Sequence, residues 1–250
     1  DEVTAYTFTV EAVDASGNIS NTGPSVTAST TDATAPTWVA GTLTAANESV
    51  STVDLAWAGA TDNSAVTGYN VYEGANLVTS LPASASTYQV TGLVEFTSYT
   101  FTVQATDAEG NESVDGPTVT TSTLDATAPI WTNGQLSAPA MGTDSIDLSW
   151  SGASDNDAVV SYQIIENGSV IATVTAPATT ATITGLTDGV SYTYTVEAVD
   201  TAGNVSNTGP SGTFNTSDGT GPTWPAGTLA SGAVTATSVE LSWSGAQDNV

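Results

Sequence analysis

The sequence repeats itself at a fixed interval of 93 residues. The related segments DATAPTW, DATAPIW and DGTGPTW begin at Asp32, Asp125 and Asp218, each 93 residues after the one before. Aromatic, acidic and proline positions keep the same step elsewhere, as at Trp57, Trp150 and Trp243. A repeat of this length, with no insertion even in its loops, predicts a tandem series of like domains.

The register of the repeat divides the chain into four parts. We expect the C-terminal part of a repeat at 1–31, complete repeats at 32–124 and 125–217, and the N-terminal part of a further repeat at 218–250. Half a β-domain would leave open sheet edges, which natural proteins avoid. The sequence therefore predicts a window on a longer tandem array, with neither end at a natural domain boundary.

Apolar and polar residues alternate within each repeat, as they do in half-buried strands. Tyr99, Phe101 and Val103 alternate with polar residues, and glycines, Asp-Asn and Gly-Pro pairs separate such runs. In the first complete repeat the predicted strands are 37–44, 52–57, 67–73, 77–80, 87–91, 97–106 and 118–122. Seven short strands in one repeat predict an all-β domain of two packed sheets.

The chain has no Lys, Arg, His or Cys and 26 acidic residues, so its formal net charge is −26. Nucleic acid and anionic membranes are excluded as partners, because both are bound through basic side chains. Catalytic sites built on a nucleophilic triad, a Schiff-base lysine or a phosphate-binding lysine are excluded as well, because they need His, Cys or Lys residues that the sequence lacks. A pair of carboxylates of the glycosidase kind remains, although nothing in the sequence indicates a cleft. Without His or Cys, a bound metal would have oxygen ligands, which favours Ca²⁺ or Mg²⁺.

The aromatic positions carry a family resemblance. A Trp on the second strand, a Tyr on the third, Leu93 six residues before Tyr99, and the run Y-x-F-x-V-x-A resemble a fibronectin type III domain. The segments DATAPTW and VEAVDASGN are similar to the variety common in bacterial extracellular proteins. The resemblance implies tandem immunoglobulin-like two-sheet β-sandwiches with a tyrosine corner, in which the hydroxyls of Tyr99 and Tyr192 hydrogen-bond backbone near the preceding turn.

The tryptophans form two sets. Trp57 and Trp150 lie on an inward-facing strand and are predicted core residues. Trp38, Trp131 and Trp224 follow the Ala-Pro or Gly-Pro of the junction between repeats. We expect these three to pack at the joint between repeats, with stacking on a carbohydrate as the alternative.

Three acidic motifs recur with the repeat: the junction aspartate, an Asp-Asn pair after the Trp strand, and the sequence D-x-x-G-N after the Tyr strand. The resemblance places all three at the pole of the sandwich where the N-terminal linker enters. Carboxylates that converge without a basic partner would repel one another unless a cation lay between them, which predicts Ca²⁺. The candidate ligands are Asp32, Asp62, Asn63, Asp107 and Asn111 in the first complete repeat, and Asp125, Asp155, Asn156, Asp200 and Asn204 in the second.

The same motifs have a simpler interpretation. Asp and Asn favour turns because their short side chains hydrogen-bond nearby backbone, and Gly supplies a positive φ. The motifs also lack the ligand ladder of a self-contained calcium loop. On the calcium hypothesis, Glu2, Glu95 and Asp188, in the loop before the Tyr strand, would reach the acidic motifs of the next repeat.

The function predicted from these features is structural rather than enzymatic. We expect a repeat array that forms an extracellular fibre, a stalk or the shaft of a cell-surface adhesin, with Ca²⁺ stiffening its joints. Its partners would be neighbouring repeats of the same chain and copies of itself in a filament. The alternatives are a spacer or accessory region of a secreted polysaccharide-degrading enzyme, and a module that binds carbohydrate or a surface partner.

Overall fold

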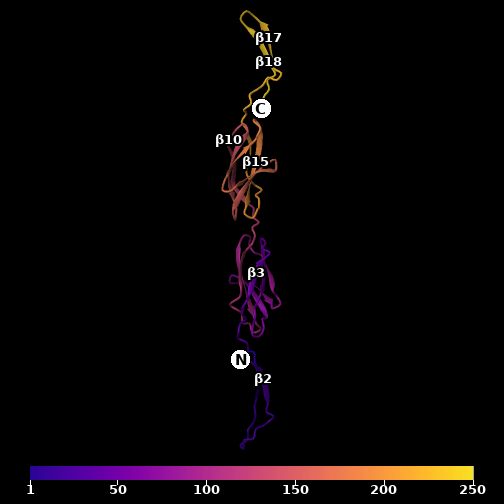
Figure 1. The fold of residues 1–250 in the computed structure, drawn as a ribbon, viewed down its shortest axis with the longest axis vertical. Coiled ribbons are helices and arrows are strands. Elements are labelled where there is room, and N and C mark those ends of the chain that lie inside the picture. Colours follow the sequence, from indigo (N-terminus) through magenta and orange to yellow (C-terminus); the bar gives the residue numbers. More distant parts are fainter. Residues whose placement is uncertain (250) are drawn as a thin grey trace. The chain divides into compact units, whose positions relative to one another are not determined.

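The computed structural model describes residues 1–249, and every regular element in that range is a β-strand (Figure 1). The contacts group the chain into two compact units, Asp1–Asp125 and Ala126–Val250. Each unit holds one complete repeat and one shorter strand pair. Within residues 1–249 no helix has the length and apolar character that crossing a membrane requires.

The first complete repeat is a sandwich of a three-stranded and a four-stranded sheet. The sheet orders are β3-β4-β7 and β6-β5-β8-β9, and all pairs are antiparallel. The strands are β3 (Thr42–Ala46), β4 (Thr52–Ala58), β5 (Gly68–Glu73), β6 (Asn76–Pro82), β7 (Thr87–Thr91), β8 (Ser98–Thr106) and β9 (Thr118–Ser122). All seven strands expected from the alternation are present, and two of them have the predicted bounds.

The first strand starts later than the alternation predicts. Thr37 makes only an isolated bridge with Thr61, and β3 begins at Thr42. Between them the backbone turns, with the amide of Gly41 donating to the carbonyl of Trp38 at 3.3 Å. The turn carries the Trp38 side chain into the interior, so the ladder cannot run unbroken through this segment.

The second complete repeat has the same topology, with sheet orders β10-β11-β14 and β13-β12-β15-β16. Its first strand is longer and carries two irregularities in register, between Trp131 and Gln135 and between Ser137 and Ala140. The strands are β10 (Ile130–Met141), β11 (Ser145–Ser154), β12 (Val159–Glu166), β13 (Ser169–Thr175), β14 (Thr180–Thr184), β15 (Ser191–Asp200) and β16 (Ser211–Asn215).

Both sheets of each sandwich contribute to one core. In the first repeat, Val53, Leu55 and Trp57 of β4 face Phe101 and Val103 of β8, and all five are buried. These are the alternate residues of the two strands, which is why the intervening side chains are more exposed. The second repeat places Leu148, Trp150 and Val196 among the matching set.

Trp38 belongs to the core of its own repeat, so the prediction that it packs at a joint between repeats is wrong. Its ring centroid lies 5.9 Å from that of Tyr69, and Trp57 contacts the same tyrosine at 5.6 Å. Its indole Nε1 donates to the buried Ser113 Oγ at 3.0 Å. Trp131 repeats the arrangement, because it packs against the core around Tyr162 and donates to Ser206 Oγ at 2.9 Å.

A tyrosine hydroxyl closes the loop before the long central strand of each sandwich. The backbone amide of Val94 donates to the hydroxyl of Tyr99, and that of Thr187 to the hydroxyl of Tyr192, both at 2.9 Å. These bonds have the partners that a tyrosine corner requires.

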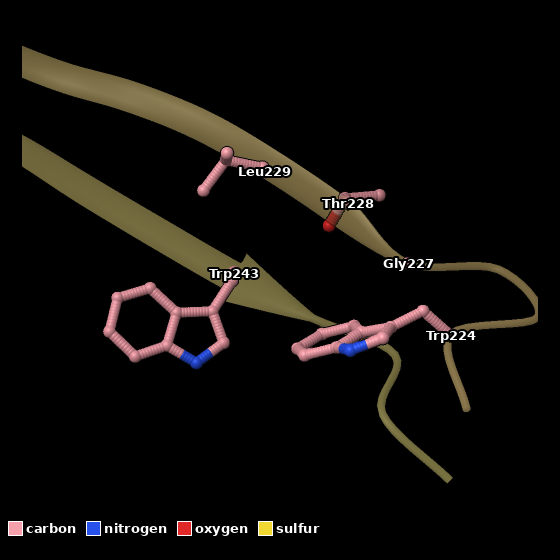
Figure 2. Close-up of a pocket in the computed structure, with 5 residues that line it drawn as sticks. All are labelled: Trp224, Gly227, Thr228, Leu229 and Trp243. Atoms are coloured by element: carbon pink, nitrogen blue, oxygen red, sulfur yellow. The ribbon is translucent and has the colours of Figure 1, made fainter. Parts of the chain in front are cut away.

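The two remaining strand pairs lack a second sheet among the described residues. β1 (Ala5–Thr9) pairs with β2 (Ser25–Ser29), and β17 (Thr228–Val234) pairs with β18 (Val239–Ser244). Trp224 and Trp243 line an open pocket of about 500 Å³ beside β17 and β18, together with Leu229 (Figure 2). The two tryptophans correspond to Trp38 and Trp57, both of which pack against Tyr69 in the complete repeat.

Candidate metal centre

The junction aspartate of the first complete repeat is a buried carboxylate. Asp32 is only 6% exposed. Its Oδ1 accepts hydrogen bonds from the backbone amide of Thr34 and from Asn63 Nδ2, both at 3.0 Å. Its Oδ2 is buried and has no hydrogen-bond partner. The linker residue is thus tied to the Asp-Asn pair after β4, and one of its oxygens is left without a donor.

The loop after β8 supplies a second buried carboxylate. Asp107 is 4% exposed, and its Oδ1 and Oδ2 accept hydrogen bonds from the backbone amide and the Nδ2 of Asn111, at 2.8 and 2.6 Å. Gly110 allows the loop to close, because its φ of 90° is strained for a residue with a Cβ. Burial acts to raise the pKa of Asp107, but the hydrogen bonds from Asn111 and from the backbone of Gly110 and Glu109 together hold that pKa below its usual value. Asp107 is therefore ionised at neutral pH.

Asp32 and Asp107 converge, and Glu109 joins them. One carboxylate oxygen from each of the three lies within 4.8 Å of the others. The link extends to the backbone, since Asn111 Nδ2 also donates to the carbonyl of Asp32 at 3.5 Å. No Lys, Arg or His exists in the sequence to compensate these charges. The convergence places two buried carboxylates, Asp32 and Asp107, beside an exposed one, Glu109.

The Asp-Asn pair after β4 lies at the same pole. Asp62 Oδ2 accepts a hydrogen bond from the backbone amide of Ser64 at 2.9 Å, whereas Asp62 Oδ1 is buried without a hydrogen-bond partner. Asp62 does not belong to the close group of three, but its neighbour Asn63 bonds to Asp32. The first repeat thus brings together four of the five predicted ligands, Asp32, Asn63, Asp107 and Asn111, whereas Asp62 is linked to them only through its chain neighbour Asn63.

The matching acids of the second complete repeat form a group of the predicted composition. Asp125, Asp155 and Asp200 each offer an oxygen within 4.8 Å of the others. Asp200 is buried and accepts from the backbone amide and the Nδ2 of Asn204, at 2.8 and 2.7 Å. Asp155 Oδ2 accepts from the amide of Asp157, and its Oδ1 is buried without a hydrogen-bond partner. Asn156 lies beside Asp155 in the chain.

The D-x-x-G-N loop closes without the other motifs. In the N-terminal strand pair Asp14 accepts bonds from the amides of Ser16 and Asn18 and from Asn18 Nδ2, at 2.7–2.9 Å, and this loop is exposed. Turn formation therefore accounts for the conformation of the loop at Asp107. It does not account for a second buried carboxylate, Asp32, beside it.

Glu109 was missed by sequence reasoning. It is an extra acid inside the loop, D-A-E-G-N, and the second repeat has Ala202 at the same position. An additional carboxylate within a candidate ligand loop is a readable signal. It was overlooked because the prediction used only positions that recur in every repeat.

Two acids of the loop before the Tyr strand, Glu2 and Asp188, contact the linker that follows their own repeat. Glu2 Oε2 accepts from Thr34 Oγ1 at 2.6 Å, and Asp188 Oδ2 accepts from Thr220 Oγ1 at 2.5 Å. The bond from Thr220 is the largest cause of the lowered pKa of Asp188. Each threonine stands two residues after a junction aspartate. Asn249, which belongs to the Asp-Asn pair of the next repeat, also donates a side-chain hydrogen bond that lowers the pKa of Asp188, so Asp188 reaches one of the acidic motifs predicted as its targets.

Comparison with known proteins places the repeats in a family. The model of the fibronectin type III domain matches residues 34–121 and 132–214. Chitinase A1 of Niallia circulans is 47% identical over 180 residues, which cover 70% of this chain and 25% of that protein. Exoglucanase B of Cellulomonas fimi is 38% identical over 231 residues, covering 88% of this chain and 20% of that protein. The chain thus spans about a quarter or less of these relatives.

Solved structures with a likeness to the chain include the fibronectin(III)-like modules of Clostridium thermocellum CbhA. They are 15% identical and cover 71% of this chain and 95% of that chain, with a TM-score of 0.37. The family match confirms the all-β fold class and the tandem type III repeats expected from the sequence. With two matched regions that together span most of its length, the chain belongs to the fibronectin type III family.

Proposed function

We propose that the chain is a non-catalytic spacer region of a secreted polysaccharide-degrading enzyme. The observation that carries the proposal is the pattern of coverage: most of this chain aligns with only a fifth to a quarter of a chitinase and of an exoglucanase. A segment shared by enzymes named for different polymers does not determine which polymer is cut. This function replaces the fibre as the main interpretation, and it implies an extracellular location.

The acidic groups do not support catalysis by the chain itself. Glycoside hydrolysis needs two carboxylates that flank a sugar, one of them as a proton donor. Asp32 and Asp107 are both buried, and the hydrogen bonds from Asn111 keep Asp107 ionised. A polymer chain cannot reach them, so we assign them no catalytic role.

The physical properties of the repeats suit a spacer. Each complete repeat has its own hydrophobic core and its own tyrosine-closed loop, so it can keep its shape independently. The formal charge of −26 opposes association of one copy with another and favours solubility. Rigid, self-repelling domains hold attached parts of a protein at a distance.

The proposal is tested with the 250-residue chain alone and in a fusion. Alone, the chain should neither hydrolyse nor adsorb to insoluble chitin and cellulose in about 0.5 M NaCl, where surface charge is screened. Placed between a chitinase catalytic domain and a chitin-binding domain, it should raise the rate on insoluble chitin above that of a direct fusion. The rate on a soluble oligosaccharide should not change.

Different results would point to different functions. Adsorption of the chain alone would make it a binding module, and release of sugar would make it an enzyme. A fusion with the same rate on insoluble chitin as the direct fusion would remove the support for spacing.

A structural shaft remains a second candidate, because the constant 93-residue period without loop insertions is what a regular array requires. That function adds lateral or end-to-end assembly to spacing. Sedimentation of the purified chain with and without Ca²⁺ distinguishes the two candidates, since a shaft should form multimers and a spacer should stay monomeric.

A further inference from the structure

We propose that each complete repeat binds one Ca²⁺ ion at its acidic pole, which in the first repeat consists of Asp32, Asp62, Asp107 and Glu109. The ion would join the linker before the sandwich to the loops after β4 and β8. The proposal does not depend on the spacer function, because a spacer, a shaft and a binding module would all retain the same site.

The first argument is electrostatic. Asp32 and Asp107 are both almost completely buried, and an oxygen of each lies within 4.8 Å of the other and of Glu109. Buried like charges destabilise one another unless a positive charge lies between them. Water screens the charges of an exposed acidic cluster, but here two of the three carboxylates, those of Asp32 and Asp107, are buried and only Glu109 is exposed. The sequence supplies no basic side chain, so the compensating charge must come from solution.

The second argument comes from atoms that lack a partner. Asp32 Oδ2 is buried and accepts no hydrogen bond, and the same is true of Asp62 Oδ1. The nearby donors are already used on the other oxygens, by Thr34 and Asn63 for Asp32 and by Ser64 for Asp62. Buried polar atoms are rarely left unsatisfied in folded proteins. A cation between the two carboxylates would satisfy both oxygens.

The donor set selects the ion. Carboxylates, side-chain amides and a backbone carbonyl are hard oxygen ligands, and Ca²⁺ accepts six to eight of them in a flexible geometry. Mg²⁺ requires a stricter octahedron and gives up its water reluctantly, so irregular loops suit it less well. The amide groups of Asn63 and Asn111 already lie within the pole, because both donate to Asp32.

The two short strand pairs carry only part of this ligand set and act as internal controls. The N-terminal pair has Asp14 in its D-x-x-G-N loop, and this aspartate is exposed. The C-terminal segment has Asp218 and Asp248 but no D-x-x-G-N motif. A strand pair that carries only part of the ligand set should not bind Ca²⁺. The chain should therefore bind two ions, one in each complete repeat, although single acidic motifs also occur in the two strand pairs.

Isothermal titration calorimetry on the 250-residue chain tests the stoichiometry. After removal of metal with a chelator, CaCl₂ is titrated in about 0.5 M NaCl, which screens non-specific attraction to the acids. We expect two Ca²⁺ per chain and at least tenfold weaker binding of MgCl₂. Asp32→Asn should reduce the number to one. The control variant Asp54→Asn removes the same charge from a partly exposed site outside the acidic pole, where Asp54 bonds to Asn47 and Gln89, and it should leave the number at two.

Hydrogen exchange of the first repeat gives a second readout, because the effect of Asp32→Asn on amide protection should have opposite signs without and with Ca²⁺. Without metal, Asp32→Asn should increase amide protection, because it removes one of two buried like charges and keeps an oxygen for Thr34. In saturating Ca²⁺ the same variant should be less protected than the wild type, because it has lost the ion. A residue that only forms a turn would show no such reversal.

Three results would overturn the proposal. The first is no Ca²⁺ binding in 0.5 M NaCl, and the second is equal binding of Ca²⁺ and Mg²⁺. The third is a stoichiometry that stays at two in Asp32→Asn. If Asp32→Asn fails to fold by circular dichroism, Asp62→Asn takes its place with the same expectation, because it removes the other oxygen that lacks a partner.

Discussion

The first complete repeat and the C-terminal strand pair hold an equivalent leucine–tryptophan pair in the same register, but the two pairs differ in burial. Leu43 lies opposite Trp57 across β3 and β4, and Leu229 lies opposite Trp243 across β17 and β18. Yet Trp57 is 4% exposed and Trp243 is 67% exposed. The hydrogen-bonded ladder is thus a local property of the pair, whereas burial requires the opposite sheet and its tyrosine.

The largest effect should separate these two tryptophans. Trp57→Ala should lower the stability of the first repeat by about 3–5 kcal/mol, because it opens a cavity against Tyr69. Trp243→Ala should change stability by less than about 0.5 kcal/mol, because the side chain is exposed. Hydrogen exchange followed by mass spectrometry measures each repeat through its own peptides. Equal costs for the two variants would mean that the ladder, not the second sheet, stabilises the tryptophan.

A smaller effect tests whether a glycine that lies against a neighbouring backbone carbonyl is needed for stability only inside a complete sandwich. A Cβ added at Gly209 would lie 1.8 Å from the carbonyl oxygen of Val196, and one at Gly23 would lie 1.8 Å from that of Val10. Gly209→Ala should cost about 2–3 kcal/mol, because packed neighbours prevent the chains from separating. Gly23→Ala should be nearly neutral in hydrogen exchange, since the N-terminal pair can move apart. A similar loss at both positions would contradict this view.

Two equivalent serines, Ser113 in the first complete repeat and Ser20 in the N-terminal strand pair, extend the comparison to hydrogen bonds. Ser113 Oγ accepts from Trp38 Nε1 and from the amide of Ala105, and donates to Gln104 Oε1 at 2.7 Å. Ser113→Ala leaves two buried donors unsatisfied and should cost about 2 kcal/mol. Ser20 makes the equivalent bonds to Ala12 and Glu11 in the exposed N-terminal pair, so Ser20→Ala should cost little. Urea unfolding followed by exchange of the first repeat measures the difference.

The sequence predicted the strands well because alternation is local. The expected strand at 52–57 differs by one residue from β4, and those at 87–91 and 118–122 match β7 and β9. Features that depend on distant contacts were less accessible. The partner of Trp38 is Ser113, 75 residues away, and nothing near either residue indicates that contact. The convergence of Asp32 with Asp107 was reached only through the family resemblance, and Glu109 was not found.

The smallest predicted effect compares three residues at one position of the repeat, Phe8, Phe101 and Tyr194. Phe8 is exposed, Phe101 is buried, and Tyr194 is buried with a hydroxyl that has no hydrogen-bond partner. Tyr194→Phe should therefore stabilise the second repeat by about 1 kcal/mol at neutral pH. Phe8→Tyr, on an exposed strand, should have no measurable effect. Thermal unfolding of the two variants measures both.

Alkaline pH isolates the contribution of that hydroxyl. Burial, with smaller contributions from Glu166 and Tyr192, raises the pKa of Tyr194 from 10.0 to about 12. Between pH 10 and 12 the hydroxyl of Tyr194 loses its proton in the unfolded state but keeps it in the folded state. The free energy of unfolding of the second repeat should therefore be unaffected by this group below pH 10 and should fall as the pH rises from 10 to 12. Burial also raises the pKa of Tyr162, so Tyr194→Phe should reduce the alkaline loss in the second repeat without abolishing it. An unchanged pH profile from 9 to 12 in Tyr194→Phe would show that the hydroxyl reaches water in the folded repeat.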